Sequence, residues 1–219
     1  MSTTADRIAD AALRLFNRKG YSATTLTEIA TEVGISQGNL TYHFPTKLDL
    51  ALHLSETVRE RTERRRAQLV PGDIADDYVE SLIFAMEMSA DYGFLMRDQG
   101  IFEPAAAVVP PSPIMTASFD ERRTLIGRIH DAGLFRAEAD VDPDMLARSL
   151  WILSRHWMEH LREMEQRETL GADAVVRGVE HHFAILLPTL TATGRRRFRS
   201  ALARARPANA QPNRSASTS

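Results

Sequence analysis

Two amide side chains, Gln37 and Asn39, offer the most specific chemistry in this chain of 219 residues. Each amide carries a donor beside an acceptor, which matches the edge that adenine presents in the major groove of double-stranded DNA. Gly38 stands between them and has no side chain, so a nucleic-acid backbone can approach closely there. This short run therefore predicts hydrogen bonding to base edges.

Groups suited to phosphate oxygens surround the amide run. Hydroxyl, phenol and imidazole groups donate hydrogen bonds to anions, and lysine adds charge. Lys47 is informative because it is expected in the first turn of a helix, where its charge opposes the helix dipole unless an anion lies nearby. The candidate DNA contacts are Thr25, Thr27, Ser36, Gln37, Gly38, Asn39, Thr41, Tyr42, His43 and Lys47.

Two short helices joined by a tight turn must position these residues. Thr25 precedes Glu28 by three residues, which is the spacing of a capping box at a helix start. Gly34 permits the positive φ of a sharp turn, and Ser36 can cap the helix that follows. The pattern over residues 25–44 predicts a helix-turn-helix, in which the second helix enters the major groove. An ordinary helical hairpin remains the alternative on spacing alone.

The remainder of the chain is also predicted to be helical, since no alternating apolar run is long enough to require a strand. Four prolines between Glu103 and Pro113 predict an extended loop there. We therefore expect an all-α fold. The predicted helices are about 4–18, a short helix after Thr25, 37–43 ended by Pro45, a helix from Lys47, 74–98, 114–132, 143–168 and 172–191.

Composition excludes several classes of protein. The chain has no cysteine, so disulfides, thiolate metal clusters and a cysteine nucleophile are impossible. No segment approaches the roughly 18 apolar residues of a membrane span, and the first residues lack a signal-peptide pattern. We expect a cytoplasmic protein that has no membrane partner and needs no cofactor.

Charge is divided unevenly behind a formal net charge of −2. Residues 1–70 carry ten Lys and Arg against eight Asp and Glu, residues 71–194 carry ten against twenty-one, and residues 195–219 carry seven against none. An acidic centre with more basic ends indicates a charged partner such as nucleic acid, and the alternative is that the surface helices are simply acidic and the tail is a solubilising run. We divide the chain into a DNA-binding domain at 1–47, a helical effector-binding and dimerisation domain at 48–194, and a basic, disordered tail at 195–219.

Flexible apolar side chains gather between residues 82 and 102, and a second group stands at 151–157. Methionine and aromatic residues commonly line adaptable apolar pockets, although they occur more often in cores. We predict a site for a small, hydrophobic effector. Its candidate residues are Phe84, Met86, Met88, Phe94, Phe102, Trp151 and Arg155.

The two last long predicted helices carry apolar stripes that could join two copies of the chain. A symmetric dimer suits a helix-turn-helix because two reading heads reach two half-sites of a symmetric operator. The alternative is that these stripes pack within one subunit. The candidate interface residues are Leu150, Leu153, Trp157, Leu161, Val175, Val179, Phe183 and Leu186.

Two short patterns resemble enzyme motifs, and both are better explained otherwise. The G-x-S-x-G match at 34–38 lacks the buried strand that a nucleophile elbow needs, so Ser36 is expected to cap a helix. His156 and His160 fit H-x-x-E-H, but apolar residues surround them, and we expect neither a catalytic site nor a metal. The sequence therefore predicts a protein that is not an enzyme.

Residues 5–53 resemble the tetracycline-repressor (TetR) family of bacterial transcriptional regulators. The shared elements, in order, are Gly20-Tyr21, Thr24-Thr25, Ile29-Ala30, Val33-Gly34-Ile35-Ser36, Gly38-Asn39-Leu40 and Tyr42-His43-Phe44-Pro45-Thr46-Lys47. The resemblance implies a three-helix DNA-binding domain, a larger helical domain that binds a small molecule, and a homodimer held by the last two long helices. Many relatives have tyrosine where this chain has Thr41, so Tyr42 or His43 is expected to carry more of the backbone contact.

These observations together predict a ligand-responsive transcriptional regulator. We expect a repressor that binds a palindromic operator as a dimer and leaves it when an effector binds. The helix that begins at Lys47 joins the two domains and is the expected transmitter. The alternative is a helical module that binds a ligand or a protein without sequence-specific DNA binding.

Overall fold

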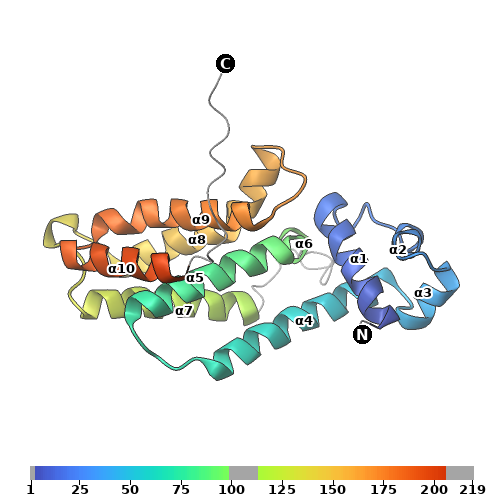
Figure 1. Ribbon diagram of the computed structural model, residues 1–219, viewed down its shortest axis with the longest axis horizontal. Coiled ribbons are helices and arrows are strands. Elements are labelled where there is room, and N and C mark those ends of the chain that lie inside the picture. The colour runs from blue at the N-terminus through green and yellow to red at the C-terminus, as the bar shows by residue number, and fades with distance from the viewer. Residues whose placement is uncertain (1–2, 99–112, 206–219) are drawn as a thin grey trace, which may run out of the picture.

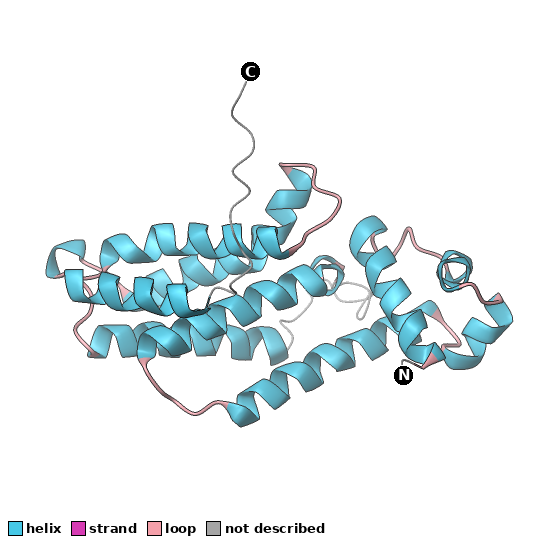
Figure 2. Cartoon of the chain, viewed as in Figure 1, coloured by secondary structure: helices cyan, strands magenta, loops and turns pink. Residues whose placement is uncertain are grey.

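The computed structural model describes residues 3–98 and 113–205, and this part of the chain is all-α, as predicted (Figures 1 and 2). Two single 3₁₀ turns, Ala137–Ala139 and Leu187–Thr189, supplement the helices. The helices are α1 (Thr4–Lys19), α2 (Leu26–Val33), α3 (Gln37–His43), α4 (Lys47–Gln68), α5 (Ile74–Asp91), α6 (Gly93–Arg97), α7 (Pro113–Asp131), α8 (Pro143–Glu163), α9 (Ala172–Leu186) and α10 (Ala192–Ala205).

Local capping bonds set the starts of the first four helices. Thr3, Thr25 and Thr46 each form a capping box with the acidic residue three positions later, and Ser36 accepts a hydrogen bond from the N–H of Asn39. Gly34 takes the left-handed conformation that closes α2, with φ of 75°. The predicted helix-turn-helix is therefore confirmed in its boundaries.

The first three helices form a reading head with its own core, and α4 leads from the head to the remaining helices (Figure 1). Phe16, Ile29 and Leu40, from α1, α2 and α3, have no exposed surface and share this core with Leu50 of α4. Burying one such side chain stabilises the fold by about 1.5–3 kcal/mol, so Leu40, the buried residue of α3, anchors this helix in the core. The other side chains of α3 are left on the surface.

The second core lies among α5, α7, α8, α9 and α10. Tyr78 of α5 is fully buried against the rings of Phe183 and Phe198, with centroids at 6.4 and 5.6 Å. This helical body carries the cavity described below.

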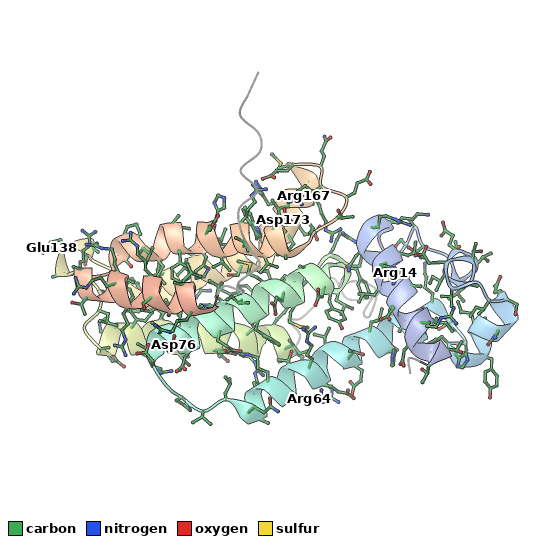
Figure 3. All side chains as sticks on the ribbon, viewed as in Figure 1. Arg14, Arg64, Asp76, Glu138, Arg167 and Asp173 are labelled. Carbon is green, nitrogen blue, oxygen red and sulfur yellow. The ribbon has the colours of Figure 1, made fainter. Side chains whose placement is uncertain are left out.

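The prediction that residues 195–219 form a disordered tail is wrong for residues 195–205. Residues 192–205 form α10, whose Phe198 and Ala201 are buried against α5. Arg197 pairs with Asp73 at 2.7 Å. Arg204 pairs with Asp76, which Figure 3 labels on the first turn of α5. The basic run complements acidic residues at the start of α5, and an apolar stripe three residues apart anchors it. Residues 207–219 lie outside the described residues.

Three predicted helices end earlier than their sequence pattern suggests. The 74–98 segment is broken at Tyr92 into α5 and α6, and the 143–168 segment stops at Glu163. The 172–191 segment gives way to a 3₁₀ turn that contains Pro188, whose ring is incompatible with a continuing helix. Pro113, predicted in a loop, is instead the first residue of α7, a position that proline favours. The other prolines of that loop lie outside the described residues.

None of the helices described here combines the length and the apolar character that crossing a bilayer requires.

Candidate DNA interface and effector cavity

The first turn of α3 presents the amide run to solvent. Gln37, Gly38 and Asn39 are all exposed, while Leu40 directly after them is fully buried. The hydroxyl of Ser36 accepts a hydrogen bond from the N–H of Asn39, at 3.1 Å, so Ser36 fixes the start of α3. The arrangement places both amide side chains on the surface, where an external partner can reach them.

Two further contacts preorganise this surface. The hydroxyl of Thr27 donates to Oε1 of Gln37 at 2.9 Å, which fixes the amide and leaves its NH₂ group to donate outward. The hydroxyl of Thr41 donates to the carbonyl of Gly38 at 3.1 Å. Tyr42 is 84% exposed and packs its ring edge-on against His43, at 5.3 Å. Thr27, Tyr42 and His43 thus stand beside the amides.

Thr25 is occupied by its capping box. Its hydroxyl donates to Glu28 Oε2 at 3.1 Å and accepts from the Glu28 N–H at 3.2 Å. Lys19 in turn donates to Glu28 at 2.6 Å, and this bond, with those from Thr25, lowers the pKa of Glu28 to about 2. Thr25 is therefore a residue that fixes the start of α2.

Lys47 is placed differently from the prediction. Its ammonium donates to the carbonyls of Tyr21 and Thr24, both at 2.8 Å, and to that of Ser22 at 3.4 Å. It also lies 4.4 Å from the centroid of the Tyr21 ring, and burial lowers its pKa. All three donors of the ammonium are used inside the protein, so Lys47 ties α4 to the loop between α1 and α2 instead of offering a free phosphate contact.

The reading head and the helical body meet at α6. The Asn17 side chain of α1 accepts from the Phe94 N–H at 3.1 Å and donates to the Asp91 carbonyl at 2.6 Å. The ring of Phe94 lies 5.0 Å from that of Phe16. Arg97 adds a hydrogen bond to the Phe16 carbonyl at 2.9 Å. These bonds give α1 a rigid attachment that the sequence pattern did not indicate.

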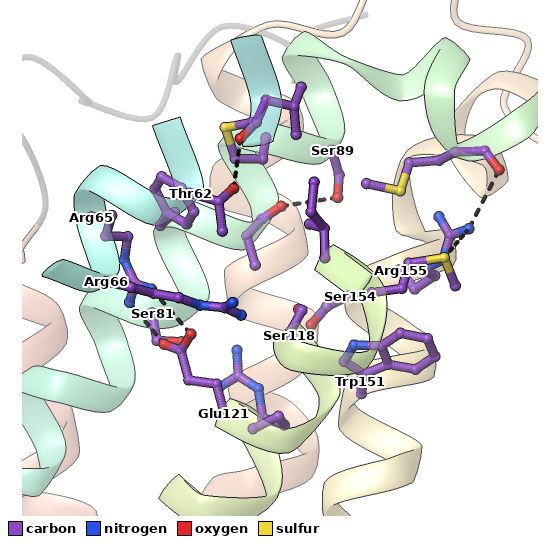
Figure 4. Close-up of a pocket in the computed structure, with 18 residues that line it drawn as sticks. Thr62, Arg65, Arg66, Ser81, Ser89, Ser118, Glu121, Trp151, Ser154 and Arg155 are labelled. Carbon is purple, nitrogen blue, oxygen red and sulfur yellow. Dashed lines mark hydrogen bonds and ion pairs between the residues drawn. The ribbon is translucent and has the colours of Figure 1, made fainter. Parts of the chain in front are cut away.

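A cavity of about 80 Å³ lies among α4, α5, α7 and α8 (Figure 4). Four of the predicted effector residues line it: Phe84, Met88, Trp151 and Arg155. One wall of the cavity is linked to the reading head through α6. Arg155 donates a hydrogen bond to the carbonyl of Met96 in α6, at 3.4 Å, and α6 contacts α1. This is the candidate effector site.

Two predicted effector residues are elsewhere, and a third is not described. Met86 is fully buried on the side of α5 that faces α9, where its sulfur would lie 2.9 Å from a Cβ at Gly178. Phe94 is buried in the core of the reading head. Neighbours along one helix point to different sides, so a rich segment contains both cavity and core residues. Phe102 lies outside the described residues.

Sequence reasoning missed the charged wall of the cavity. Arg65 of α4 bonds Glu121 of α7 at 2.9 Å and Glu80 at 2.6 Å, and all but a tenth of its side chain is buried. Arg122 beside them is 3% exposed and lines the cavity as well. A signal was present: Arg122 stands in register with the buried apolar positions that follow it in α7, where a charged residue requires an explanation.

A buried polar network lies behind this wall. The hydroxyl of Ser154 donates to the Leu150 carbonyl at 3.0 Å, so it accepts from Nδ1 of His182, which lies at 3.2 Å. The other ring nitrogen, Nε2, then accepts from the Tyr78 hydroxyl at 2.6 Å. Burial holds the pKa of His182 well below its usual range, with a smaller contribution from Arg122. The ring is therefore neutral and fixed in one tautomer.

Comparison with known proteins places these features in a family. The family model described as "Bacterial regulatory proteins, tetR family" matches residues 8–54, and one described as "Bacterial transcriptional repressor", TetR, matches residues 113–198. Together they cover more than half of the chain and include both the reading head and the helical body. The chain belongs to the TetR family. The family consists of DNA-binding regulators and not of enzymes, which supports the non-enzymatic prediction.

Individual relatives of this TetR-family chain match over different lengths. The regulator CymR of Pseudomonas putida is 35% identical over 81 residues, which is 36% of this chain and 40% of CymR. RutR of Escherichia coli K12 is 28% identical over 177 residues, 72% of this chain and 75% of RutR. A solved γ-butyrolactone receptor described as ArpA-like is 25% identical, with a TM-score of 0.65, and covers 92% of this chain and 95% of the receptor.

The residues predicted for a dimer interface in this TetR-family protein are mostly buried inside one subunit. All eight belong to or pack against the core of the body, and six of them are less than a tenth exposed. A side chain with so little exposed surface offers little to a second copy, so burial within one subunit argues against those six, and the dimer interface stays a prediction. The six are Leu150, Trp157, Leu161, Val179, Phe183 and Leu186.

Three large apolar side chains of the same two helices are exposed. Met145 and Ile152 of α8 are 66% and 48% exposed, and Ile185 of α9 is 44% exposed. The helices run beside each other, and Trp157 of α8 lies with its ring 4.6 Å from that of His181 on α9. The stripe predicted to form the interface is the more apolar part of these helices and packs inside the subunit. Met145, Ile152 and Ile185 remain on the surface.

The glutamate of the H-x-x-E-H pattern is engaged in ion pairs. Glu159 of the H-x-x-E-H pattern pairs with Arg97 at 3.6 Å and Arg162 at 3.5 Å. Its two histidines are exposed, and no set of three His, Asp or Glu side chains suited to a metal occurs within residues 3–98 and 113–205.

Proposed function

We propose that this TetR-family protein is a dimeric repressor that binds a palindromic operator and releases it when a small, largely apolar effector enters the body. The observation that carries the proposal is the exposed first turn of α3, in which Gln37 and Asn39 are both on the surface while Leu40 is buried. Amide heads held in this way suit adenine-containing half-sites.

Within each half-site, the division of labour follows the geometry. Gln37, Gly38 and Asn39 meet base edges, while Thr27, Tyr42 and His43 contact the phosphate backbone. Thr25, Ser36 and Thr41 act mainly by fixing the helices, and Lys47 holds α4 against the head. Tyr42, at 84% exposure, takes the backbone contact that many relatives give to the preceding residue.

A homodimer would bury the exposed apolar face of α8 and α9. Ile152 and Ile185 are its central residues, and large apolar side chains gathered on one face favour association. A two-fold axis between the bodies would set the two heads at a fixed spacing, as a palindromic operator requires.

The effector would act through the helices that touch both the cavity and the head. The last turns of α4 supply Thr62 and Arg65 to the cavity, while Leu50 and Leu54 at its start pack in the head. Helix α6 offers a second route, since Met96 lines the cavity and Phe94 packs on Phe16. A ligand that favours one arrangement of these helices shifts the spacing of the heads by its differential affinity. Binding of a small molecule in the body is also consistent with the γ-butyrolactone receptor named above.

The decisive experiment is selection of bound sequences from a pool of random DNA duplexes. We expect an enriched palindrome whose half-sites change when Gln37 or Asn39 is replaced. Absence of any enriched sequence would contradict the proposal and favour a helical module that binds a ligand or a protein without reading DNA.

A further inference from the structure

The guanidinium of Arg122 is buried in the cavity wall with a donor nitrogen unused. The residue is 3% exposed, and its Nη1 has no hydrogen-bond partner. Burying a charged donor is costly unless an acceptor meets it, and nearly all buried polar groups in folded proteins have one. A cavity beside such a group is a place where an acceptor can be supplied from outside.

The side chains around Arg122 are committed to other partners. Its guanidinium lies 4.6 Å from the centroid of the Tyr78 ring, and its interaction with the Tyr78 hydroxyl, which donates to His182 at 2.6 Å, partly offsets the rise that burial causes in the pKa of Tyr78. The carboxylate of Glu121 accepts two hydrogen bonds from Arg65, at 2.9 and 3.1 Å, and also interacts with the hydroxyl of Ser81. Burial lowers the pKa of His182, so this ring adds no positive charge beside Arg122, and its partners Tyr78 and Ser154 carry no carboxylate.

The described part of the lining carries an excess of positive charge. Within residues 3–98 and 113–205, four arginines and one acidic residue, Glu121, line the cavity. Figure 4 shows Arg65, Arg66 and Glu121 gathered at one end of the cavity, with Trp151 and Arg155 toward the other. Arg65 holds Glu121, so no carboxylate of the described lining forms an ion pair with Arg66, Arg122 or Arg155, and Arg122 acts on Glu121 only through its charge.

The hydroxyl groups of the cavity do not compete for this role. Thr62, Ser89 and Ser154 each donate to a carbonyl of their own helix, at 2.8, 2.9 and 3.0 Å. Ser81 hydrogen-bonds the Glu121 carboxylate, so Ser118 and the guanidiniums are the donors that remain in the described lining, and of these only the guanidiniums are charged. A ligand would therefore be selected for its acceptors and its negative charge.

The rest of the lining is apolar and adaptable. Phe84, Met88, Met96, Ile114 and Trp151 contribute rings and flexible side chains. We propose that the effector is an amphipathic organic acid, whose carboxylate binds Arg122 and whose apolar body lies against Phe84, Met88 and Trp151. The role of this acid in regulation rests on the proposed function. Its chemical class is inferred from the cavity alone.

Binding of defined probes to the full chain without DNA tests this chemistry. Butyrate, hexanoate and benzoate, small enough for a cavity of about 80 Å³ that widens slightly, are each compared with the alcohol and the primary amide of the same skeleton, by calorimetry at neutral pH. We expect at least one acid to bind about tenfold or more tightly than both of its neutral analogues, as a charge-assisted hydrogen bond predicts. Acetate, which lacks the apolar body, is expected to bind far more weakly than that acid.

Variants at position 122 test whether Arg122 causes the preference for the acid over its neutral analogues. Arg122→Gln should abolish the preference for the acid, and Arg122→Lys should retain part of it because the charge remains. The matched control is Arg123→Gln, which removes the same charge from an exposed position next to it on α7 and should leave the preference intact. Circular dichroism and thermal unfolding report whether each variant is folded.

Two results would overturn the proposal. One is that no acid in the unaltered protein binds better than its neutral analogues, a comparison that needs no folded variant. The other is that folded Arg122→Gln keeps the preference. Operator selection is measured separately, so a chain that binds acids through Arg122 but enriches no DNA sequence would refute the proposed function and leave this inference standing.

Discussion

The side chain of Asn17 in α1 bridges two backbone groups of the helical body, the Phe94 N–H at 3.1 Å and the Asp91 carbonyl at 2.6 Å. One amide thus satisfies a donor at the start of α6 and an acceptor at the end of α5. Because α6 also supplies Met96 to the cavity, this amide stands between the candidate effector site and the reading head.

Replacing Asn17 tests that connection. Asn17→Ala leaves both backbone groups without their partner, and we expect unfolding free energy to fall by about 1–3 kcal/mol, with a weaker effect of effector on operator binding. Urea unfolding and operator titration with and without effector measure the two effects. Asp10→Ala, at an exposed position of the same helix, is the control. An unchanged effector response in the alanine variant at position 17 would remove α6 from the proposed route.

Lys47→Met separates a structural lysine from a phosphate contact. Loss of the bonds to the Tyr21 and Thr24 carbonyls should lower the unfolding free energy by about 1–3 kcal/mol. The slope of the logarithm of DNA affinity against the logarithm of salt concentration should stay the same, since no phosphate contact is lost. A slope reduced by about one would show that Lys47 neutralises a phosphate after all.

Gln37→Ala and Asn39→Ala should relax base preference at separate positions of each half-site. We expect discrimination against a substituted base pair to fall by about 1–3 kcal/mol at one position in each variant, with little change at the others. Affinities for a set of operators with single base-pair substitutions measure this. Uniform loss across the whole set would instead indicate that the two amides only position the helix.

The neutral His182 predicts how stability depends on pH. The pKa of this residue is lowered in the folded protein, so the unfolded chain takes up a proton first as the pH falls below about 6.5. Stability from this group is therefore present above that pH and is lost below it, by at most about 1.4 kcal/mol per pH unit. Urea unfolding at pH 7.5, 6.5 and 5.5 should show a steeper decline in the natural chain than in His182→Gln. Parallel declines would contradict this assignment.

Ile152→Arg and Ile185→Arg should each convert the proposed dimer to monomers that remain folded. A charge introduced at the centre of an apolar interface is desolvated without a partner, whereas on a free surface it costs little. Light scattering during size-exclusion chromatography measures the mass. Val70→Arg, at an 83% exposed apolar position outside this face, is the control and should remain dimeric.

The boundaries of the reading head could be predicted from sequence because short-range bonds set them. The boxes at Thr25 and Thr46, the cap at Ser36 and the positive φ of Gly34 each involve residues within about four positions of one another. Such interactions are visible as spacing in the chain. The exposure of Gln37 and Asn39 follows from the same spacing, since Leu40 is the apolar position that faces inward.

Only the tertiary structure decided which partner each long side chain meets and which face of each body helix is covered. Lys47 reaches carbonyls more than twenty residues earlier in the chain, Arg122 faces a cavity, and Leu161 is buried while Ile152 is not. A helix with apolar residues on more than one side does not specify which side packs, because that depends on how neighbouring helices cross it. The sequence thus determined the local elements and the chemistry of the reading surface, whereas the packing of α4 to α10 determined the cavity, its charge and the surface left for a second copy.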